Sequence, residues 1–247
     1  MTSTIELEQD AIIRSHHKPF ASLDFEKGEI LTIDKPEGWT SFDVVKKVRS
    51  LLRVKKVGHA GTLDPFATGV LVVCTGRATK RVSALMGLDK EYVACLELGK
   101  ETDTFDVTGK IVRRGDPGDV TAEKLQRVCA DFRGEIEQIP PMFSAVKVGG
   151  KRLYKLARKG QVVERRPRRV VVHELELLHF ENPFATIRVV CSKGTYIRTL
   201  AHDIGRRLGC GAYLKSLTRT RVGSFRLENA LTVEELAEQA KNRSVLK

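Results

Sequence analysis

Runs of apolar residues, separated by turns rich in glycine and proline, predict strands along most of the chain. The strands that we expect lie at residues 29–33, 70–73, 90–99, 143–148, 168–178, 185–191 and 212–223. The run at 70–73 reads VLVV, which is typical of a short buried strand.

Helical spacing of apolar residues marks other segments. Thr40 is placed to cap a helix that runs to about Arg53, with Asp43 near the N3 position. Further helices are expected at residues 78–86, 121–132, 194–209 (capped by Thr195 and ended near Gly209) and from Val233 onward. Because strands and helices do not alternate as regular βαβ units, the pattern predicts an α+β fold with a mixed, largely antiparallel sheet.

Three segments are expected: an N-terminal extension of residues 1–28, one large domain of residues 29–225, and a short helical tail of residues 226–247. A chain of 247 residues with 41% hydrophobic and 30% charged residues is typical of a soluble globular protein. No run approaches the roughly 20 apolar residues of a membrane span. The start TSTIELEQDAII carries acids where a signal peptide needs basic residues, so we expect a cytosolic protein.

The net charge is +12, and much of the positive charge is concentrated in one segment of the chain. Residues 147–169 contain four lysines and six arginines against one acid, Glu164. Such a stretch suits a polyanion such as nucleic acid, although a solvated basic face is the plainer interpretation. Its phosphate-binding candidates are Arg165, Arg166, Arg168 and Arg169. An aromatic content of 6% argues against a broad stacking platform for single strands.

Several other chemistries are excluded by spacing. The five cysteines form no C-x-x-C pair, and the six histidines form no cluster at metal-ligand spacing, so neither a disulfide framework nor a metal site is expected. No phosphate-binding G-x-x-x-x-G-K-[ST] motif occurs. The sequence GHAG matches the G-x-x-G loop of KH RNA-binding modules, but such a loop joins two helices, and here a strand follows.

Three residues are candidates for function, each beside a purely structural interpretation. Asp64 precedes a proline, and an aspartate in that position often only shapes a turn. Its loop is rich in glycine, however, and such a backbone allows a ligand to approach closely. Arg198 has no carboxylate within one helical turn, so it is either a solvated surface residue or a partly buried one that needs a distant anion. Tyr92 shares a strand face with Ala94 and Leu96, which is also typical of a core tyrosine.

These residues lie in sequence blocks that resemble, in the same order, those of the TruB-type tRNA pseudouridine synthases. The blocks are DKPEGWTSFDVV, GHAGTLDPFATGVLVV, DKEYVACLELGKETDTFD, PPMFSAVKVGGKRLYKLARKG and CSKGTYIRTLAHDIGRRLGCGAYLKSLTRTRVG. The resemblance runs from about Ile30 to Phe225. The fourth block is closer to the bacterial tRNA enzyme than to the archaeal and eukaryotic guide-RNA-dependent relatives.

The resemblance implies a fold with a mixed central sheet and an RNA-binding cleft, and conversion of uridine 55 in the T-loop of tRNA to pseudouridine. It implies no metal, nucleotide or organic cofactor, and we expect a monomer. Bacterial members commonly carry a further C-terminal RNA-binding domain. Only residues 226–247 follow Phe225, so we expect that domain to be absent or reduced to one helix, and the T-arm stem-loop to be the part of tRNA that binds.

The resemblance also implies roles for individual residues. Asp64 matches the nucleophilic aspartate, Tyr92 the tyrosine that stacks on the target base, and Arg198 the arginine that pairs with the aspartate. The other matching positions are His59, which supports the flipped-out loop, Lys35 and Pro36, which brace the active-site loop, and Tyr196 and Leu200, which line the pocket.

Isomerisation requires the glycosidic bond to break, the base to turn and a carbon–carbon bond to form. A carboxylate can attack ring carbon 6, attack the anomeric carbon or assist deprotonation of the ribose, and the sequence leaves all three routes open. Two other functions also remain open: a noncatalytic RNA-binding or RNA-folding module, and a basic structural protein of a ribonucleoprotein. Only the enzyme needs Asp64, Arg198 and Tyr92 together.

Overall fold

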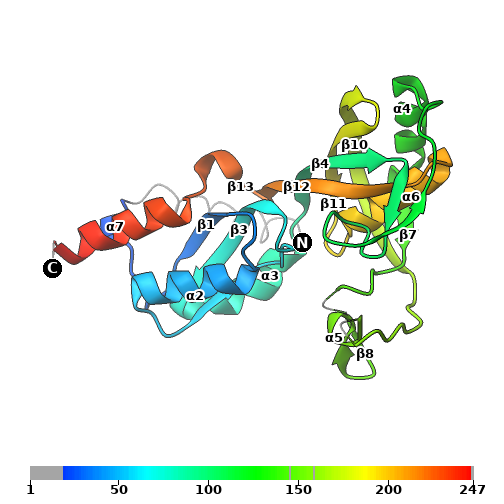
Figure 1. Ribbon diagram of the computed structural model, residues 1–247. Helices are drawn as coiled ribbons and strands as arrows, with labels where there is room; N and C mark the ends of the chain where they lie inside the picture. Colours follow the sequence, from blue (N-terminus) through cyan, green and yellow to red (C-terminus); the bar gives the residue numbers. More distant parts are fainter. Residues whose placement is uncertain (1–18, 145, 158, 246–247) are drawn as a thin grey trace. The chain divides into compact units, whose positions relative to one another are not determined.

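Strand β12 (Ala212–Val222) passes from one compact unit to another in the computed structural model, which describes residues 19–144, 146–157 and 159–245 (Figure 1). The first unit contains residues 1–90 and 218–247, and the second contains residues 91–217. An N-terminal extension was predicted for residues 1–28, and residues 1–18 of it lie outside the described part of the chain.

β3 (Thr68–Thr75) is the central strand of the first unit. It pairs antiparallel with β1 (Ile30–Lys35) along the whole of β1. It also pairs antiparallel with β2 (Val57–His59) and parallel with Thr218 and Arg219 of β12. β13 (Phe225–Arg226) pairs antiparallel with the end of β12. The loop that carries Asp64 joins β2 to β3, so it is anchored at both ends in one sheet.

Both faces of β3 are covered, which explains why residues 70–73 are continuously apolar. Leu71 and Val73 pack in a core cluster with residues of α2 and α7, whereas Val70 and Val72 pack with residues of α3 and β13. The helices of this unit are α2 (Ser41–Leu52), α3 (Val82–Gly87), α7 (Val233–Val245) and the short 3-10 helices η1 (Phe20–Ser22), η2 (Gly76–Arg81) and η3 (Leu227–Asn229).

The start of α2 confirms the predicted cap. The Thr40 hydroxyl accepts a hydrogen bond from the Asp43 amide at 3.1 Å, and the Asp43 carboxylate accepts one from the Thr40 amide at 2.9 Å. This reciprocal capping box satisfies two amides that the first helical turn leaves unpaired. It fixes the direction in which the chain enters α2, directly after the turn at residues 36–39.

The second unit has an antiparallel hairpin at its centre. β10 pairs with β11 on one side and with β7 on the other, and β4 and the first half of β12 continue the strand order as β12-β4-β11-β10-β7. The bounds are β4 (Lys90–Leu98), β7 (Gly134–Gln138), β10 (Arg168–Glu181) and β11 (Phe184–Cys191). Two small hairpins are β5 (Lys100–Thr102) with β6 (Ile111–Arg114), and β8 (Lys147–Val148) with β9 (Lys151–Arg152).

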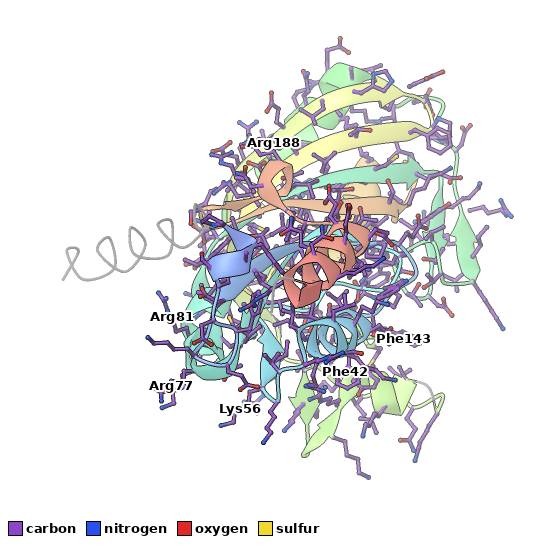
Figure 2. The ribbon with its side chains drawn as sticks, turned by 90° about the vertical axis from the view of Figure 1, so that its left-hand side faces the viewer. Phe42, Lys56, Arg77, Arg81, Phe143 and Arg188 are labelled. Atoms are coloured by element: carbon purple, nitrogen blue, oxygen red, sulfur yellow. The ribbon has the colours of Figure 1, made fainter. Side chains whose placement is uncertain are left out.

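Helices α4 (Ala122–Asp131) and α6 (Ile197–Leu208) pack on each other in the second unit, and α4 also packs on β10. The short helix α5 (Leu153–Ala157) follows β9. On the sheet, Arg188 of β11 reaches Glu174 of β10 at 2.6 Å and Glu91 of β4 at 2.8 Å (Figure 2). This arginine therefore joins three neighbouring strands, and the helices and mixed sheet confirm the predicted α+β class.

Several local predictions were wrong. Of the strand expected at residues 143–148, only Lys147 and Val148 are in a strand among the described residues, because the chain there forms a small hairpin. The segment 78–86 begins as a 3-10 helix and becomes α-helical only at Val82. Thr195 does not cap α6, since its hydroxyl donates to the Ser192 carbonyl at 2.9 Å.

Candidate active site

The backbone around Asp64 is tied to the turn that precedes α2. The Leu63 amide donates to the Ser41 hydroxyl at 2.9 Å, and the Gly38 amide donates to the Pro65 carbonyl at 2.8 Å. The Asp64 carbonyl accepts from the Ala67 amide at 3.1 Å, which closes a tight turn. Asp64 itself is half-buried. The structure therefore holds its backbone from both sides while leaving part of the residue accessible.

Lys35 is fully buried beside this turn. Its ammonium donates to the carbonyls of Pro36 at 2.8 Å, Trp39 at 2.6 Å and Pro65 at 3.2 Å. Burial lowers the pKa of Lys35 to about 8, and the negative charge of Asp64 opposes that shift. All three hydrogens of the ammonium are thus used to join the turn at 36–39 to the residue that follows Asp64.

Arg219 supports the other end of the loop, and the sequence reasoning missed it. Its side chain is fully buried and donates to the carbonyls of Val70 at 2.7 Å and Gly61 at 3.1 Å. A side chain at Gly69, which has a φ of +99°, would meet the backbone of Arg219 at 2.3 Å. The close approach of the two strands explains the glycine.

His59 lies outside the loop that carries Asp64. It is the last residue of β2, and its backbone pairs with that of Val73 in β3. Burial lowers the pKa of its half-buried side chain, so the imidazole is neutral at neutral pH. That loop consists of residues 60–67, between β2 and β3.

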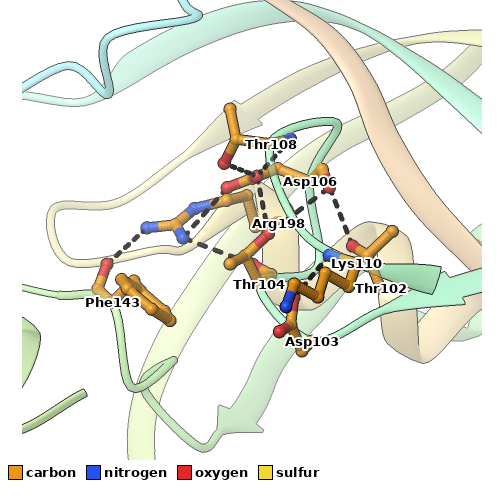
Figure 3. A network of polar contacts seen from close by, with 8 residues as sticks. All are labelled: Thr102, Asp103, Thr104, Asp106, Thr108, Lys110, Phe143 and Arg198. Atoms are coloured by element: carbon orange, nitrogen blue, oxygen red, sulfur yellow. Dashed lines mark hydrogen bonds and ion pairs between the residues drawn. The ribbon is translucent and has the colours of Figure 1, made fainter. Parts of the chain in front are cut away.

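In the second unit, the side chain of Arg198 is almost completely buried. Its guanidinium lies 3.2 Å from a carboxylate oxygen of Asp106 and donates to the carbonyls of Thr104 at 3.3 Å and Phe143 at 2.8 Å (Figure 3). The surface interpretation of this arginine is therefore excluded, and the need for a distant anion is confirmed. Asp106 was not among the site residues predicted from the sequence.

Asp106 is held rigidly by its own turn. Its Oδ1 accepts from the hydroxyl of Thr104 at 2.7 Å, from the amide of Thr108 at 2.9 Å and from the hydroxyl of Thr108 at 2.6 Å (Figure 3). Its Oδ2 faces Arg198. An aspartate that bonds the chain two residues on is a recognised turn former, and the acid–threonine alternation of ETDTFDVT is the signal that predicts it. The guanidinium plane is consequently preoriented.

Three further predicted residues lie in this unit. Tyr92 is buried on the same face of β4 as Ala94. The backbone of Tyr196 exchanges two hydrogen bonds with the Gln138 side chain, at 2.9 and 3.2 Å, which fixes the start of α6. Leu200 is fully buried. Burial of Tyr92 fits both a core residue and a stacking surface, so its role stays a prediction.

The four arginines of the basic segment differ in environment. Arg165 donates to the Pro140 carbonyl at 3.2 Å, and Arg169 lies 3.3 Å from Glu135, although its side chain remains 73% exposed. Arg166 and Arg168 are exposed. The segment is therefore only partly available for phosphates.

A second basic cluster, in the first unit, was also missed. The cluster consists of Lys56, which precedes β2, and of Arg77, Lys80 and Arg81 in η2; the two segments are neighbours because the Gly76 amide donates to the Lys56 carbonyl at 2.9 Å. Figure 2 shows Lys56, Arg77 and Arg81 of this cluster. Within the part of the chain that the structure describes, none of these four side chains forms an ion pair with an acid. The cluster therefore contains four positively charged side chains that have no ion-pair partner among the described residues.

The predicted residues thus divide between the units. Asp64, His59, Lys35 and Pro36 belong to the first, and Arg198, Tyr92, Tyr196, Leu200 and the four arginines belong to the second. The pairing of Asp64 with Arg198 stays a prediction. Among residues 19–144, 146–157 and 159–245, no group of histidine, cysteine and acidic side chains is arranged to hold a metal ion, and no helix is long and apolar enough to cross a membrane.

Comparison with solved structures gives the class of protein. The chain is similar to a chain of a crystallised Cbf5-Nop10-Gar1 complex, with a TM-score of 0.71 and 36% identity, over 91% of this chain and 57% of that one. It is also similar, with a TM-score of 0.66 and 33% identity, to a chain in the structure of an H/ACA RNP bound to a substrate RNA containing 2'-deoxyuridine, over 92% of this chain and 55% of that one. The chain therefore shares the fold of these two proteins, and the sequence comparison identifies the class as the pseudouridylate synthases.

Sequence comparison gives the family. Residues 49–197 match the N-terminal domain of the TruB family pseudouridylate synthases, and residues 198–247 match the tRNA pseudouridylate synthase B C-terminal domain. The chain is 53% identical over 220 residues to tRNA pseudouridine synthase B of Parabacteroides distasonis, covering 87% of this chain and 94% of the relative. It is 56% identical over 211 residues to that of Symbiobacterium thermophilum, covering 84% and 71%. The chain belongs to the TruB family and is a pseudouridylate synthase.

Proposed function

We propose that this protein converts uridine 55 in the T-loop of tRNA to pseudouridine, with Asp64 as the nucleophile. The proposal rests on the hydrogen bonds around Asp64. Bonds with Ser41, Gly38 and Lys35 fix the backbone on both sides of this half-buried residue. The tRNA substrate rests on the relatives, which are named tRNA pseudouridine synthase B.

The carboxylate must be ionised near neutral pH on each of the three routes that remain open. The Lys35 ammonium, whose pKa responds to the charge of Asp64, favours the ionised form. Arg198 is proposed to contact the same carboxylate and to orient it. Asp106 supports that role because it fixes the guanidinium before substrate arrives, so that no reorganisation is needed during the reaction.

A uridine stacked in a folded RNA loop is not accessible to a carboxylate, so the nucleotide has to flip out. Unstacking costs a few kcal/mol. Stacking of the base on Tyr92 is proposed to return on the order of 1–3 kcal/mol, with His59 supporting the opened loop and Tyr196 and Leu200 lining the pocket. The RNA-binding cleft of the family stays a prediction.

Phosphate contacts are proposed for the exposed arginines of the basic segment and for the cluster around Arg77. Such contacts hold the RNA in register without reading its sequence. We propose residues 29–225 as the catalytic domain, residues 226–247 as a helical tail, and the T-arm stem-loop as the part of tRNA that binds. The protein is proposed to act as a cytoplasmic monomer without a cofactor.

The test is incubation with unmodified tRNA, followed by mapping of pseudouridine at single-nucleotide resolution. Pseudouridine at position 55 is expected, with none in a tRNA that carries cytidine there. An isolated T-arm stem-loop is expected to be nearly as good a substrate as whole tRNA. Binding of tRNA without any pseudouridine would favour the noncatalytic RNA-binding alternative.

A further inference from the structure

Phe105 has an unusual backbone conformation beside Asp106. Its φ is +64°, and the other non-glycine residue with positive φ in the described chain is Arg53, the C-cap of α2, where this conformation is common. No helix ends at Phe105. A left-handed conformation is strained for a residue with a Cβ, and such strain persists only where the surroundings determine it.

The Phe105 ring stacks on the imidazole of His202, with the ring centroids 3.9 Å apart and the planes inclined by 17°. His202 follows Arg198 by four residues in α6, so the two side chains lie on the same helix face. Two consecutive loop residues therefore contact consecutive turns of one helix: Phe105 contacts His202, and Asp106 contacts Arg198.

The backbone of the loop is fixed separately. The Phe105 carbonyl accepts from the Leu214 amide at 3.0 Å, and the Val107 amide donates to the Leu214 carbonyl at 3.0 Å. These bonds set the position of the loop along β12, and the Phe105 amide donates to the Thr102 carbonyl at 3.2 Å. The conformation of Phe105 decides where the Asp106 carboxylate points, and the stacked rings add a side-chain contact that holds this conformation.

The imidazole lies in a buried environment next to charged groups. His202 is buried, and its Nδ1 lies 3.9 Å from Glu101, whose carboxylate also pairs with Arg113 at 2.6 Å and Arg206 at 3.2 Å. Burial lowers the pKa of His202, Glu101 opposes the shift, and the two arginines add to it. Because burial is the largest cause of the lowered pKa, the histidine is uncharged at neutral pH and presents a flat ring to Phe105.

We propose that Phe105 and His202 are positioning residues, whose stacking aims Asp106 at Arg198 and so orients the guanidinium for catalysis. The inference rests on the proposed role of Arg198. The plainer interpretation is that Phe105 only covers a buried histidine, in which case it affects stability and not the rate.

Phe105→Gly separates the two interpretations, because glycine removes the ring and also removes the cost of the positive φ. We expect the single-turnover rate on unmodified tRNA to fall roughly 10- to 100-fold, the range that a small misplacement of a catalytic group produces, with the tRNA Kd within about threefold. Phe105→Tyr keeps the ring and should retain the wild-type rate. A wild-type rate in Phe105→Gly would overturn the proposal.

A matched pair on the helix keeps the test decisive if Phe105→Gly does not fold. His202→Ala should be as slow as Phe105→Gly, whereas His202→Phe restores a flat ring and should recover most of the rate. Equal rates for these two variants would also overturn the proposal.

A double-mutant cycle tests the route of the effect. If Phe105 acts through Asp106, then Phe105→Gly should slow an Asp106→Asn enzyme much less than it slows the wild type. Full additivity would contradict the inference. These outcomes are distinct from failure of the proposed function, which would appear as absence of pseudouridine from tRNA treated with the wild-type enzyme.

Discussion

Replacing Arg198 by lysine keeps the positive charge but removes the planar guanidinium, which places several N–H donors in fixed directions. The guanidinium contacts Asp106, Thr104 and Phe143 at once, and a single ammonium on a flexible chain does not span these three acceptors. The 2.8 Å bond to the Phe143 carbonyl is the best formed of those to carbonyls. Hydrogen bonds that involve a charged group contribute about 1.5–3 kcal/mol, so Arg198→Lys should lower the free energy of unfolding by about that amount.

The catalytic effect of this substitution should be much larger than its effect on stability or binding. If the guanidinium orients the Asp64 carboxylate, then the single-turnover rate should fall on the order of 100-fold, while the tRNA Kd changes only a few-fold. Unfolding is followed by circular dichroism, and the rate by pseudouridine formation with excess enzyme.

The matched control is Arg188→Lys, an arginine of the same unit that pairs with Glu91 and Glu174 on the sheet. Pairs of this kind near the surface contribute about 0–1 kcal/mol, so this variant should be near wild type in stability and rate. If Arg198→Lys reacted within threefold of the wild-type rate, the proposed role of the guanidinium would be wrong.

Three further predictions follow from the remaining contacts. Lys35→Met should lower the unfolding midpoint of the first unit, read from the fluorescence of Trp39, because three carbonyls lose their donor; an unchanged midpoint would contradict this. Changing Arg166 and Arg168 to glutamine should reduce the slope of log K for tRNA binding against log salt concentration by roughly 0.7–0.9 per lost phosphate contact. An unchanged slope would mean that neither arginine contacts the RNA backbone. Burial raises the pKa of Asp203 from 3.8 to about 6, so the folded state binds this proton more tightly than the unfolded state and loses stability as the pH rises through this window. The stability advantage of Asp203→Asn over the wild type, measured by urea unfolding, should therefore grow between pH 3.8 and 6 and then level off. A difference that does not change with pH would refute the assignment.

The sequence was informative where one local pattern determined the structure. The Thr40 cap, the buried run at 70–73 and the end of α6 at Gly209 were predicted because each depends on residues within one or two turns of chain. The strand predicted at 143–148 was wrong because a local pattern is ambiguous at that length: a short hairpin and a strand show the same alternation of apolar and polar residues.

The partners of the site residues were beyond the reach of local patterns. Arg198 was recognised as needing a distant anion, but the choice of Asp106, 92 positions away, depends on how the loop folds against α6. Arg219, whose guanidinium contacts a carbonyl 158 positions away, gave no local signal at all. Family blocks identified Asp64, and only the structure showed which backbone bonds hold its turn.

The most direct test of the account is the rate of pseudouridine formation in tRNA by Asp64→Asn, since asparagine keeps the size of the side chain and removes its negative charge. Asp119→Asn, at an exposed position of the second unit, is the control for loss of one acidic residue. We expect no pseudouridine from Asp64→Asn in single-turnover reactions, a tRNA Kd within a few-fold of wild type, and a wild-type rate from Asp119→Asn. Measurable turnover by purified Asp64→Asn would show that this carboxylate is not the nucleophile.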